Sequence, residues 1–493
     1  LEWWECDFTP DDTGLYFYHF EIKTDHGIKR LSKGKFGEAI SHGTDKWQLT
    51  VYERKYETPG WLAGGVMYQI FPDRFCSVGR CEYAERKFHK NWSEIPDWKP
   101  DEDGVIRNND FFGGDLKGIE SRLNHLKELG VTCIYLNPVF EAYSNHRYDT
   151  ANYEKIDPVL GTEKDFADLC TKAGEHNIKV VIDGVFNHTG SDSIYFNKEG
   201  RYNTVGAYNS KESEYYDWYN FSNWPDEYEC WWGFETLPNV NETNEKFNNY
   251  INGSDGIAKK WLRLGASGWR LDVADELPDE FLDSFTHAVK SEKEDALVLG
   301  EVWEDASNKS AYGRRRKYLL GDQFDSIMNY PFRESIIDYL KGDDPESFFE
   351  TIESVLENYP PEVVNMLMNH IGTHDTERII TVLGGNEVGI NGREWQSKEE
   401  LSGKQWRIGT ARLKLAVLMQ FTLPGVPCIY YGDEAGVEGY KDPFNRKTFP
   451  WDKMNYEIFD WYKRVSLLRK ENKIFKYEGF ERIICEGDVI GYT

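Results

Sequence analysis

The chain has 493 residues, of which 58 are Lys or Arg and 85 are Asp or Glu, which gives a net charge of −27. This length exceeds one ordinary domain and suits a large barrel with smaller satellites. An acidic chain of this kind is repelled by nucleic-acid phosphates and by anionic membranes, so we expect neither as a partner. No run of about 18 apolar residues is present to span a membrane. No signal peptide is evident, and a bacterial cytoplasmic location is expected rather than secretion.

Residues 1–57 alternate apolar and polar side chains. The alternation is clearest at Leu15–Ile22 and at Trp47–Tyr52. A period of two residues predicts β-strands. We therefore expect residues 1–57 to form an N-terminal β segment that ends near Glu57–Gly60.

From Val66 onward, short apolar runs alternate with amphipathic stretches typical of helices. Such alternation predicts a parallel sheet, and eight runs suit a closed (β/α)8 TIM barrel over residues 58–472. A doubly wound open sheet is the alternative, but no GxGxxG motif follows an early strand, which disfavours it. The runs are Val66–Ile70, Val131–Leu136, Lys179–Asp183, Gly268–Val273, Leu297–Val302, Phe324–Met328, Asn365–His374 and Pro427–Tyr431.

Two stretches depart from this pattern. Residues 189–245, between the third and fourth runs, are rich in Tyr, Asn, Trp and Ser, and we expect an inserted subdomain over the active face. After residue 472, strand-like alternation returns at Phe475–Phe480 and Arg482–Cys485. Residues 473–493 are therefore expected to begin a C-terminal β domain that has been cut short.

Two of the apolar runs end in carboxylates suited to cleaving a glycosidic bond. Asp272 ends the fourth run and Glu301 ends the fifth. Adjacent strands lie about 4.8 Å apart, which suits the separation of about 5 to 5.5 Å between the carboxyl groups of a retaining glycosidase. Arg270 lies two residues before Asp272 and points the same way, so we expect it to keep Asp272 ionised as a nucleophile.

A third carboxylate and two histidines complete the candidate site. Asp375 follows His374 after the seventh run, and His188 follows the third. Asp375 could bind the hydroxyls of the attacked sugar, and both histidines could donate hydrogen bonds to it. Each residue alone has an ordinary alternative, because a strand-end Asp is often a helix cap and a lone His is usually structural. Their joint occurrence at successive strand ends carries the inference.

These residues lie in blocks that resemble the four signature regions of the α-amylase family of glycosidases, and the resemblance extends over about residues 60–490. It implies a barrel with an inserted B domain, a C-terminal β domain, and retaining action on α-glucosidic bonds. It also implies that Asp272 is the nucleophile, Glu301 the general acid/base and Asp375 the transition-state stabiliser. The sugar would be bound by Arg270, His188, His374, Tyr148, His146 and Trp303. The matching blocks are Asp183–His188, Gly268–Glu276, Gly300–Trp303 and Ile371–Asp375, joined by Met67–Phe75, Gly130–Phe140, Ser144–Thr150 and Pro427–Glu434.

Within that family, the chain is most similar to the neopullulanase, cyclomaltodextrinase and maltogenic amylase group. This likeness implies a starch-binding-like N-terminal segment, hydrolysis of α-1,4 bonds in maltooligosaccharides, cyclodextrins or related α-glucans, and a homodimer formed through the complete N-terminal domain. The chain departs from the group at Asp275, Glu304 and Leu237–Asn241, all on the leaving-group side. An α-glucan transglycosylase or an exo-acting α-glucosidase is the alternative. An inactive sugar-binding or structural relative is the third, and the three carboxylates speak against it.

Calcium is the metal that the resemblance implies. Asn187 would be one ligand of a site between the barrel and the B domain, and Gly114 and Asp115 match a Gly-Asp pair of a loop site in the neopullulanase-like group. The segment Cys76–Cys81 lacks the Asn and Asp oxygens expected there. Its two cysteines could form a disulfide, although nothing else points to an oxidising compartment. No organic cofactor is expected.

Overall fold

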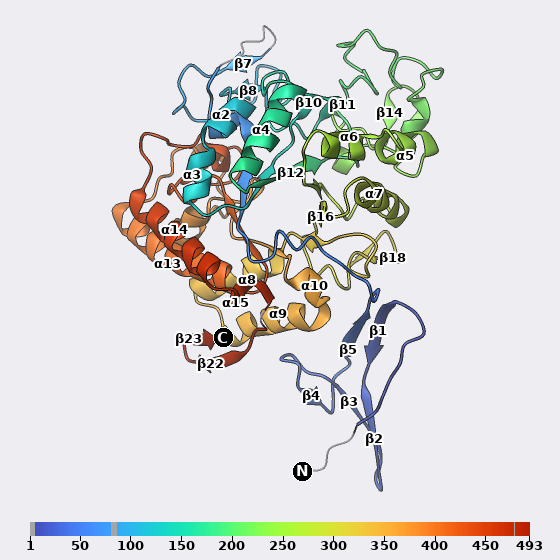
Figure 1. The fold of residues 1–493 in the computed structure, drawn as a ribbon, viewed down its shortest axis with the longest axis vertical. Coiled ribbons are helices and arrows are strands. Elements are labelled where there is room, and N and C mark those ends of the chain that lie inside the picture. Colours follow the sequence, from blue (N-terminus) through green and yellow to red (C-terminus); the bar gives the residue numbers. More distant parts are fainter. Residues whose placement is uncertain (1–4, 80–85, 478) are drawn as a thin grey trace.

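A computed structural model describes residues 5–79, 86–477 and 479–493. Cys81 lies outside the described residues, and with it the disulfide considered above. The first strands lie beside the main body of the molecule, at the lower right of Figure 1. The strand expected over Leu15–Ile22 is confirmed but divides at His19. The segment contains β1 (Gly14–Tyr18), β2 (Phe20–Thr24), β3 (Gly27–Lys33), β4 (Ala39–Ile40) and β5 (Trp47–Val51).

Eight parallel strands form the barrel that the apolar runs predicted. Their spatial order is β19-β16-β15-β12-β9-β6-β21-β20, and a parallel bridge between Met328 and Met368 joins the two ends of the sheet. Each strand lies within a predicted run or overlaps it. The strands are β6 (Met67–Ile70), β9 (Cys133–Leu136), β12 (Lys179–Gly184), β15 (Gly268–Leu271), β16 (Leu297–Gly300), β19 (Ser326–Ile327), β20 (Met368–His370) and β21 (Val426–Tyr430).

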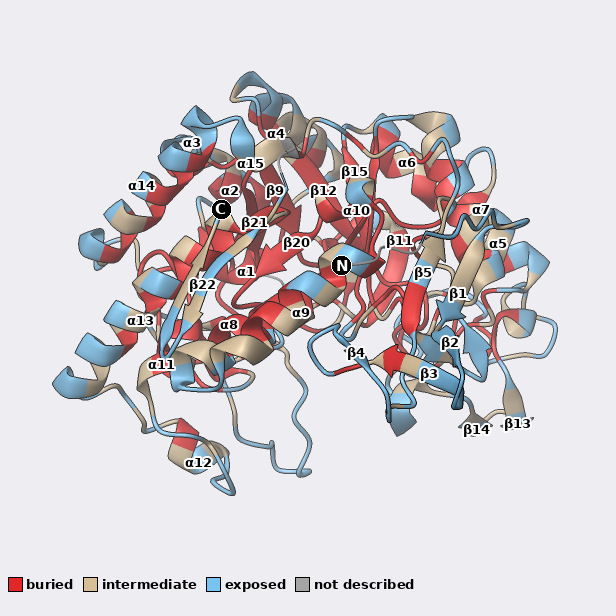
Figure 2. Cartoon of the chain, turned by 90° about the horizontal axis from the view of Figure 1, so that it is seen from below, coloured by how far each residue is buried: buried red, intermediate tan, exposed pale blue. Residues whose placement is uncertain are grey.

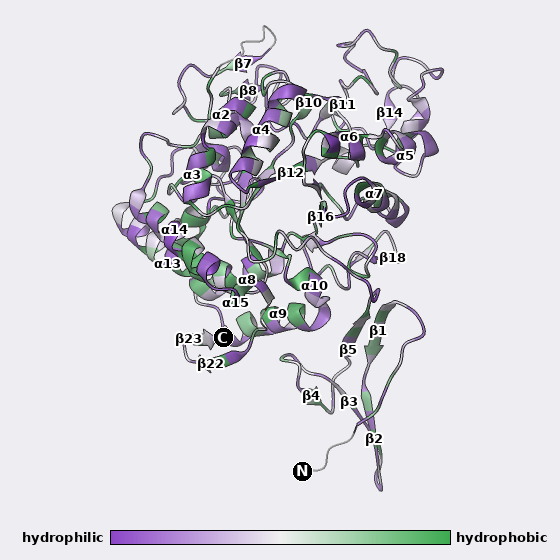
Figure 3. Cartoon of the chain, viewed as in Figure 1, coloured by the Kyte–Doolittle hydropathy of each residue, from purple (hydrophilic) through white to green (hydrophobic). Residues whose placement is uncertain are grey.

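Helices surround this barrel and cover it on the outside (Figure 1). Buried residues gather on the strands and on the inward sides of helices in Figure 2, and Figure 3 shows apolar and polar positions mixed along the same helices. The helices are α1 (Pro72–Phe75), α2 (Leu116–Ser121), α3 (Leu123–Glu128), α4 (Glu163–Glu175), α5 (Glu245–Asn252), α6 (Ile257–Arg263), α7 (Asp279–Glu292), α8 (Tyr330–Lys341), α9 (Pro345–Asn358), α10 (Pro361–Val364), α11 (Ile379–Gly384), α12 (Arg393–Gln396), α13 (Gly403–Thr422), α14 (Tyr456–Glu471) and α15 (Ile474–Tyr477).

Helix α4 illustrates how local sequence sets these elements. Thr162 accepts a hydrogen bond from the Asp165 backbone, and the Asp165 side chain accepts one from the Thr162 backbone, which forms a capping box. Phe166, Leu169 and Ala173 recur at helical spacing and are buried. The helix therefore begins at its cap and packs its apolar face onto the barrel.

Short elements occupy the loops at the carboxyl ends of the strands. Short elements lie between β12 and β15, where an insertion over residues 189–245 stays a prediction, and a small hairpin lies between β16 and β19. These elements are η1 (Tyr216–Trp218), β13 (Phe221–Asn223), β14 (Glu227–Tyr228), η2 (Trp231–Gly233), β17 (Ser310–Ala311) and β18 (Arg314–Arg315), with β7 (Lys87–Phe88), β8 (Asp110–Phe111), β10 (Phe140–Ala142), β11 (Thr150–Ile156) and η3 (Phe444–Arg446) in other loops.

The end of the chain differs in part from the expectation. The strand predicted over Phe475–Phe480 is wrong in its first part, because Ile474–Tyr477 forms helix α15. The strand at Arg482–Cys485 is confirmed, as β22 (Arg482–Glu486) pairs with β23 (Val489–Tyr492) in an antiparallel hairpin. Within the described residues, no helix combines the length and apolarity needed to cross a bilayer. The domain boundaries at residues 57/58 and 472/473 stay predictions.

Candidate active site

One buried arginine joins three carboxylates at the carboxyl ends of β12, β15 and β16. Arg270 Nη1 lies 2.8 Å from Asp183 Oδ1 and 2.8 Å from Asp272 Oδ1. Its Nη2 atom lies 2.9 Å from Glu301 Oε2. The parallel register pairs Asp183 with Arg270, and β16 lies on the other side of β15. Neighbouring strands thus bring Asp272 and Glu301 together, as predicted, and the structure adds that both contact one guanidinium group.

The two oxygens of Glu301 are in different surroundings. Oε2 accepts a hydrogen bond from the Val273 backbone at 2.8 Å and also faces Arg270. Oε1 accepts one from Trp303 Nε1 at the longer distance of 3.3 Å. Donors favour negative charge on the oxygen that they contact. A proton on Glu301 is therefore better accommodated at Oε1.

Val273 reaches this position through an uncommon backbone conformation. Its φ angle is +40°, in the left-handed region that is a genuine outlier for a β-branched residue. Its backbone N–H points at Glu301 Oε2. The turn after the candidate nucleophile thus supplies a hydrogen-bond donor to the candidate acid.

The charge of Arg270 is shared, which changes one expectation. Burial is the largest effect on the pKa of Asp272 and raises it; Arg270 lowers it, and the carboxylates of Glu301 and Asp183 raise it further. The sequence predicted that Arg270 would keep Asp272 ionised. The contact is present, but one guanidinium group is shared by three carboxylates. Its effect on Asp272 is therefore outweighed, and the pKa of Asp272 is raised.

Tyr148 and His374 form one wall of the predicted sugar site. The Tyr148 hydroxyl donates to Asp183 Oδ2 at 2.9 Å, and His374 Nε2 donates to the same hydroxyl at 2.5 Å. Gln69 Nε2 lies 2.9 Å from His374 Nδ1, which fits an unprotonated Nδ1. The His374 and Tyr148 rings stack with centroids 5.2 Å apart. His146 supports this wall, because its Nδ1 atom accepts from the Tyr148 backbone at 3.1 Å.

His188 lines the cleft, and its hydrogen bond to the sugar stays a prediction. Burial lowers the pKa of His188 to about 4, so its ring is neutral. Nδ1 lies 3.2 Å from Asn187 Oδ1, to which it donates when it carries the ring proton. Nε2 is buried and has no hydrogen-bond partner among the described residues. It can therefore accept a hydrogen bond from a sugar hydroxyl.

Asp375 faces the other carboxylates from β20's end of the barrel. Its Oδ2 atom lies 3.1 Å from His374 Nε2, and its Oδ1 atom lies 3.5 Å from Arg446 Nη2. Desolvation in the cleft, and then Glu301, raise the pKa of Asp375, while Arg446 opposes them. Because 31% of its side chain is exposed, solvent moderates this shift. Asp375 can thus reach a sugar directly.

Arg446 was missed by sequence reasoning. It is buried, donates from Nε to the His374 carbonyl at 3.0 Å, and pairs with Asp442 at 3.0 Å. It lies in the loop after β21, within η3, where no periodic signal marks it. Only its place in a loop at the active edge of the barrel could have suggested it.

The predicted residues meet in a cleft of about 1320 Å³. Arg270 lies beneath it and is fully buried. Trp303 lies at the wall, with 47% of its surface exposed, and stacks on Tyr330 with centroids 4.1 Å apart. The lining includes Asp272, Glu301, Asp375, His146, Tyr148, His188, Trp303 and His374, with Trp231, Trp232, Glu276, Tyr312 and Arg446.

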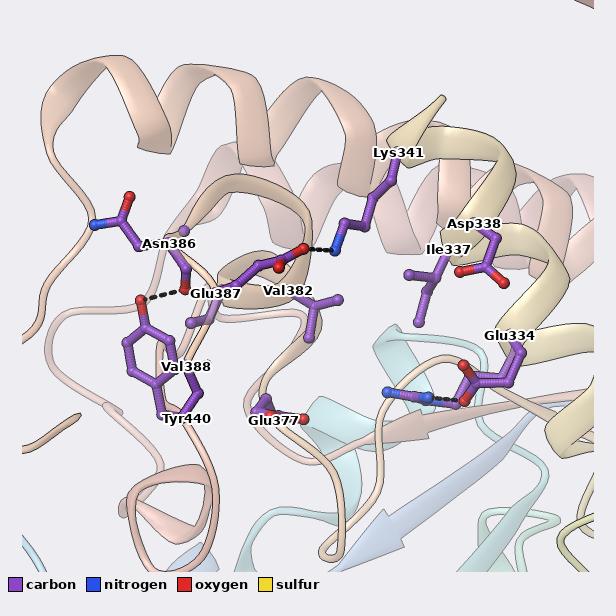
Figure 4. Close-up of a pocket in the computed structure, with 13 residues that line it drawn as sticks. Glu334, Ile337, Asp338, Lys341, Glu377, Val382, Asn386, Glu387, Val388 and Tyr440 are labelled. Carbon is purple, nitrogen blue, oxygen red and sulfur yellow. Dashed lines mark hydrogen bonds and ion pairs between the residues drawn. The ribbon is translucent and has the colours of Figure 1, made fainter. Parts of the chain in front are cut away.

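A smaller pocket of about 280 Å³ lies elsewhere, between α8 and α11 (Figure 4). A Lys341–Glu387 ion pair of 2.8 Å lies along one side, and the Tyr440 hydroxyl donates to the Asn386 carbonyl at 3.0 Å. None of the predicted site residues lines it. The candidate active site is therefore the larger cleft.

The residues named for calcium do not fit that ion. Both oxygens of Asp115 are engaged by backbone N–H groups: Oδ2 by Val78 and Gly79, and Oδ1 by Gly118, where Asp115 caps α2. A Cβ atom on Gly114 would lie 2.2 Å from the Pro72 carbonyl oxygen, so tight packing explains this glycine. Asn187 contacts Glu242 Oε1 at 3.3 Å, but that pair offers fewer than the six to eight oxygens that calcium takes.

Among the described residues, no group of three or more His, Cys, Asp or Glu side chains is placed to hold a metal ion. Calcium binding stays a prediction.

The fold and the site together define a class. A (β/α)8 barrel presents two carboxyl groups on one guanidinium, with a third carboxylate beside them, in an open cleft at its carboxyl edge. Paired carboxyl groups at this edge of a barrel are typical of glycoside hydrolases.

Comparison with known proteins leads to the same class of protein. Residues 69–458 match the family described as alpha amylase, catalytic domain. The chain belongs to the α-amylase family of glycoside hydrolases. It is 39% identical to an amylopullulanase of Thermoanaerobacter thermohydrosulfuricus, over 100% of this chain and 36% of that protein. It is 36% identical to a cyclomaltodextrinase of Thermoanaerobacter pseudethanolicus, over 88% of this chain and 68% of that protein.

A solved structure, the type III pullulan hydrolase from Thermococcus kodakarensis, superposes with a TM-score of 0.76 at 29% identity, covering 94% of this chain and 80% of that one. The chain spans between 28% and 41% of the length of the three amylopullulanases that it matches.

Proposed function

We propose that this chain is a retaining α-glycosidase that hydrolyses α-1,4-glucosidic bonds in maltooligosaccharides, cyclodextrins or related α-glucans. The observation that carries the proposal is the pair of Asp272 and Glu301 held on Arg270 at the floor of an open cleft. Relatives named cyclomaltodextrinase and neopullulanase support an α-glucan substrate.

In the first step, Asp272 attacks the anomeric carbon while Glu301 protonates the departing oxygen. Arg270 contacts Asp272 Oδ1, so we assign the attack to Oδ2. The proton leaves from Glu301 Oε1, since Oε2 is engaged by Val273 and Arg270. The product of this step is a glycosyl ester on Asp272.

In the second step, the carboxylate of Glu301 removes a proton from water, which attacks the same carbon and releases the sugar with retained configuration. The donors on Oε2 stabilise that carboxylate. Asp375 accepts hydrogen bonds from hydroxyl groups of the distorted sugar, and Tyr148 stacks on its ring with His146, His374 and His188 around it. The sugar-binding roles of these residues are part of the proposal.

The leaving-group side carries a cation that the sequence did not single out. Lys309 Nζ lies 2.9 Å from Asp275 Oδ2 and also contacts Glu304. Asp275 and Glu304 are two of the positions at which this chain departs from its relatives. Because Lys309 contacts both residues, we infer that this chain prefers a different leaving group from its relatives.

A side-by-side digest of maltoheptaose, β-cyclodextrin and pullulan tests the proposal, with products sized by chromatography. We expect short maltooligosaccharides from at least one of them, with the anomeric configuration of the substrate. Asp272→Asn is the matched control. Unchanged turnover by that variant would remove Asp272 from the mechanism, and inverted products would exclude a glycosyl ester.

Transglycosylation is the second candidate, because an acceptor sugar could replace water in the second step. The exposed ring of Trp303 beside Glu301 could hold such an acceptor. Longer oligosaccharides at early times in a maltotriose digest would favour transfer over hydrolysis. A homodimer through the N-terminal segment and a cytoplasmic location stay predictions.

A further inference from the structure

One carboxylate links three loops that follow neighbouring barrel strands. Glu276 lies in the loop after β15, and its Oε1 atom accepts a hydrogen bond from Trp232 Nε1 at 3.3 Å. Its Oε2 atom accepts one from the Tyr312 hydroxyl. Trp232 belongs to the insertion after β12, and Tyr312 to the turn of the β17–β18 hairpin after β16. We call Trp232, Glu276 and Tyr312 the rim.

The two rings of the rim are presented to solvent by uncommon backbone conformations. Trp232 is 77% exposed and Tyr312 is 75% exposed. Their φ angles are +49° and +52°, in the left-handed region. Bulky residues seldom adopt this conformation unless their surroundings favour it. Trp232 and Tyr312 are each followed by a glycine that also has a positive φ angle, as in a type I′ turn, and each contacts Glu276.

The rim bounds the leaving-group side of the cleft, and its three residues line that cleft. The sugar under attack lies near Tyr148 and His374, which come from the loops after β9 and β20. Glu301 protonates the departing oxygen from the end of β16, so the rest of the leaving group extends toward the loops after β15 and β16. Glu276 and Tyr312 stand in those loops.

We propose that the rim determines the length of the leaving group. While Glu276 holds Trp232 and Tyr312, the cleft accepts short leaving oligosaccharides. Long α-glucan chains are cleaved only after one of the two contacts opens and the loops separate. This inference rests on the proposed function and names the substrate length that the site selects.

Both hydrogen bonds of Glu276 must be intact for the rim to stay closed, so the loss of either one opens it. Both are exposed, so each is weaker than a buried charged hydrogen bond. Loss of one should shift the balance toward the open form by about three- to tenfold. Two independent contacts with sugar would instead have effects that multiply.

The experiment uses Tyr312→Phe and Trp232→Phe, which remove the hydroxyl and the indole N–H and keep an aromatic ring. The kcat/KM values for amylose and for maltotriose are measured for the wild type, both variants and the double variant. We expect the amylose-to-maltotriose ratio to rise by about three- to tenfold in each single variant. The double variant should match the larger single effect.

Tyr456→Phe is the matched control, because Tyr456 is an exposed tyrosine on α14 and does not line the cleft. Its ratio should equal that of the wild type. An unchanged ratio in both single variants, or single effects that multiply in the double variant, would overturn the rim inference alone. A wild type that cleaves neither substrate would overturn the proposed function and this inference with it.

Discussion

At the scale of single residues, the active site depends on which oxygen of each carboxyl group is already engaged. Arg270 contacts Asp272 through Oδ1 and Glu301 through Oε2. The Val273 backbone adds a second donor to Oε2. The opposite oxygens, Asp272 Oδ2 and Glu301 Oε1, are left for attack and for proton transfer.

This division of roles predicts that the functions of the two carboxyl groups can be distinguished with substrates whose leaving groups differ in their need for a proton. Glu301→Gln should lower kcat/KM on maltotriose by about 10²- to 10⁴-fold, because an amide cannot donate the proton. On α-maltosyl fluoride the loss should be much smaller, because fluoride departs without protonation. Asp272→Asn should lose activity on both substrates. Equal losses of the Glu301 variant on both substrates would contradict its role as the acid.

At the scale of elements, α2 shows how a loop is held against a helix. Asp115 caps the helix and also receives two N–H groups from the loop after α1. Gly118, within the helix, lies against the Cys76 backbone: a Cβ atom there would lie 2.0 Å from the Cys76 carbonyl oxygen. The glycine is therefore required by close packing of two backbones.

Gly118→Ala should accordingly destabilise the protein by about 1–3 kcal/mol, because a backbone must shift to admit the methyl group. Gly174→Ala is the matched control in α4, where an added Cβ atom meets nothing within 4 Å. That substitution should be neutral or stabilising by up to about 1 kcal/mol. Thermal unfolding of both variants measures the difference. A Gly118 variant as stable as the wild type would show that α2 can move.

At the scale of the whole molecule, a buried acidic group makes stability depend on pH. Asp192, in the insertion, packs near Asp149 in the loop after β9. Burial, followed by the Asp149 carboxylate, raises the pKa of Asp192 from 3.8 to about 7, while Arg201 opposes the shift and Glu199 adds to it. Arg201 Nε lies 2.9 Å from Asp192 Oδ2. The contact between insertion and barrel is therefore sensitive to pH.

The folded chain binds the Asp192 proton more tightly than the unfolded chain. The resulting stabilisation is complete below pH 3.8 and is lost as the pH rises toward 7. Asp192→Asn cannot ionise, so its melting temperature relative to the wild type should be higher at pH 8 than at pH 5, by about 2–4 °C. Scanning calorimetry at both values measures this. The same difference at both pH values would mean that Asp192 does not titrate on folding.

The barrel and its three carboxylates could be predicted because their signals are local. Buried strands appear as short apolar runs, and the residue that ends a parallel strand faces the active edge whatever the rest of the chain does. Asp272, Glu301 and Asp375 follow β15, β16 and β20 in this way. The blocks that resemble the α-amylase family are built on the same strand ends, so the class of enzyme followed from the sequence.

Contacts through space were decided only by the tertiary structure. Asp115 accepts hydrogen bonds from Val78 and Gly79, which lie more than thirty residues away in the sequence, so no local pattern records these contacts. Arg446 reaches Asp375 from a loop whose sequence shows no hydrophobic periodicity. Glu276 joins loops that lie more than thirty residues apart in the sequence. Periodicity records which face of an element is buried; it does not record which partner a polar atom finds. The sequence by itself therefore determined the family and the strand ends that carry the three carboxylates, and only the tertiary structure decided which hydrogen-bond partners surround them.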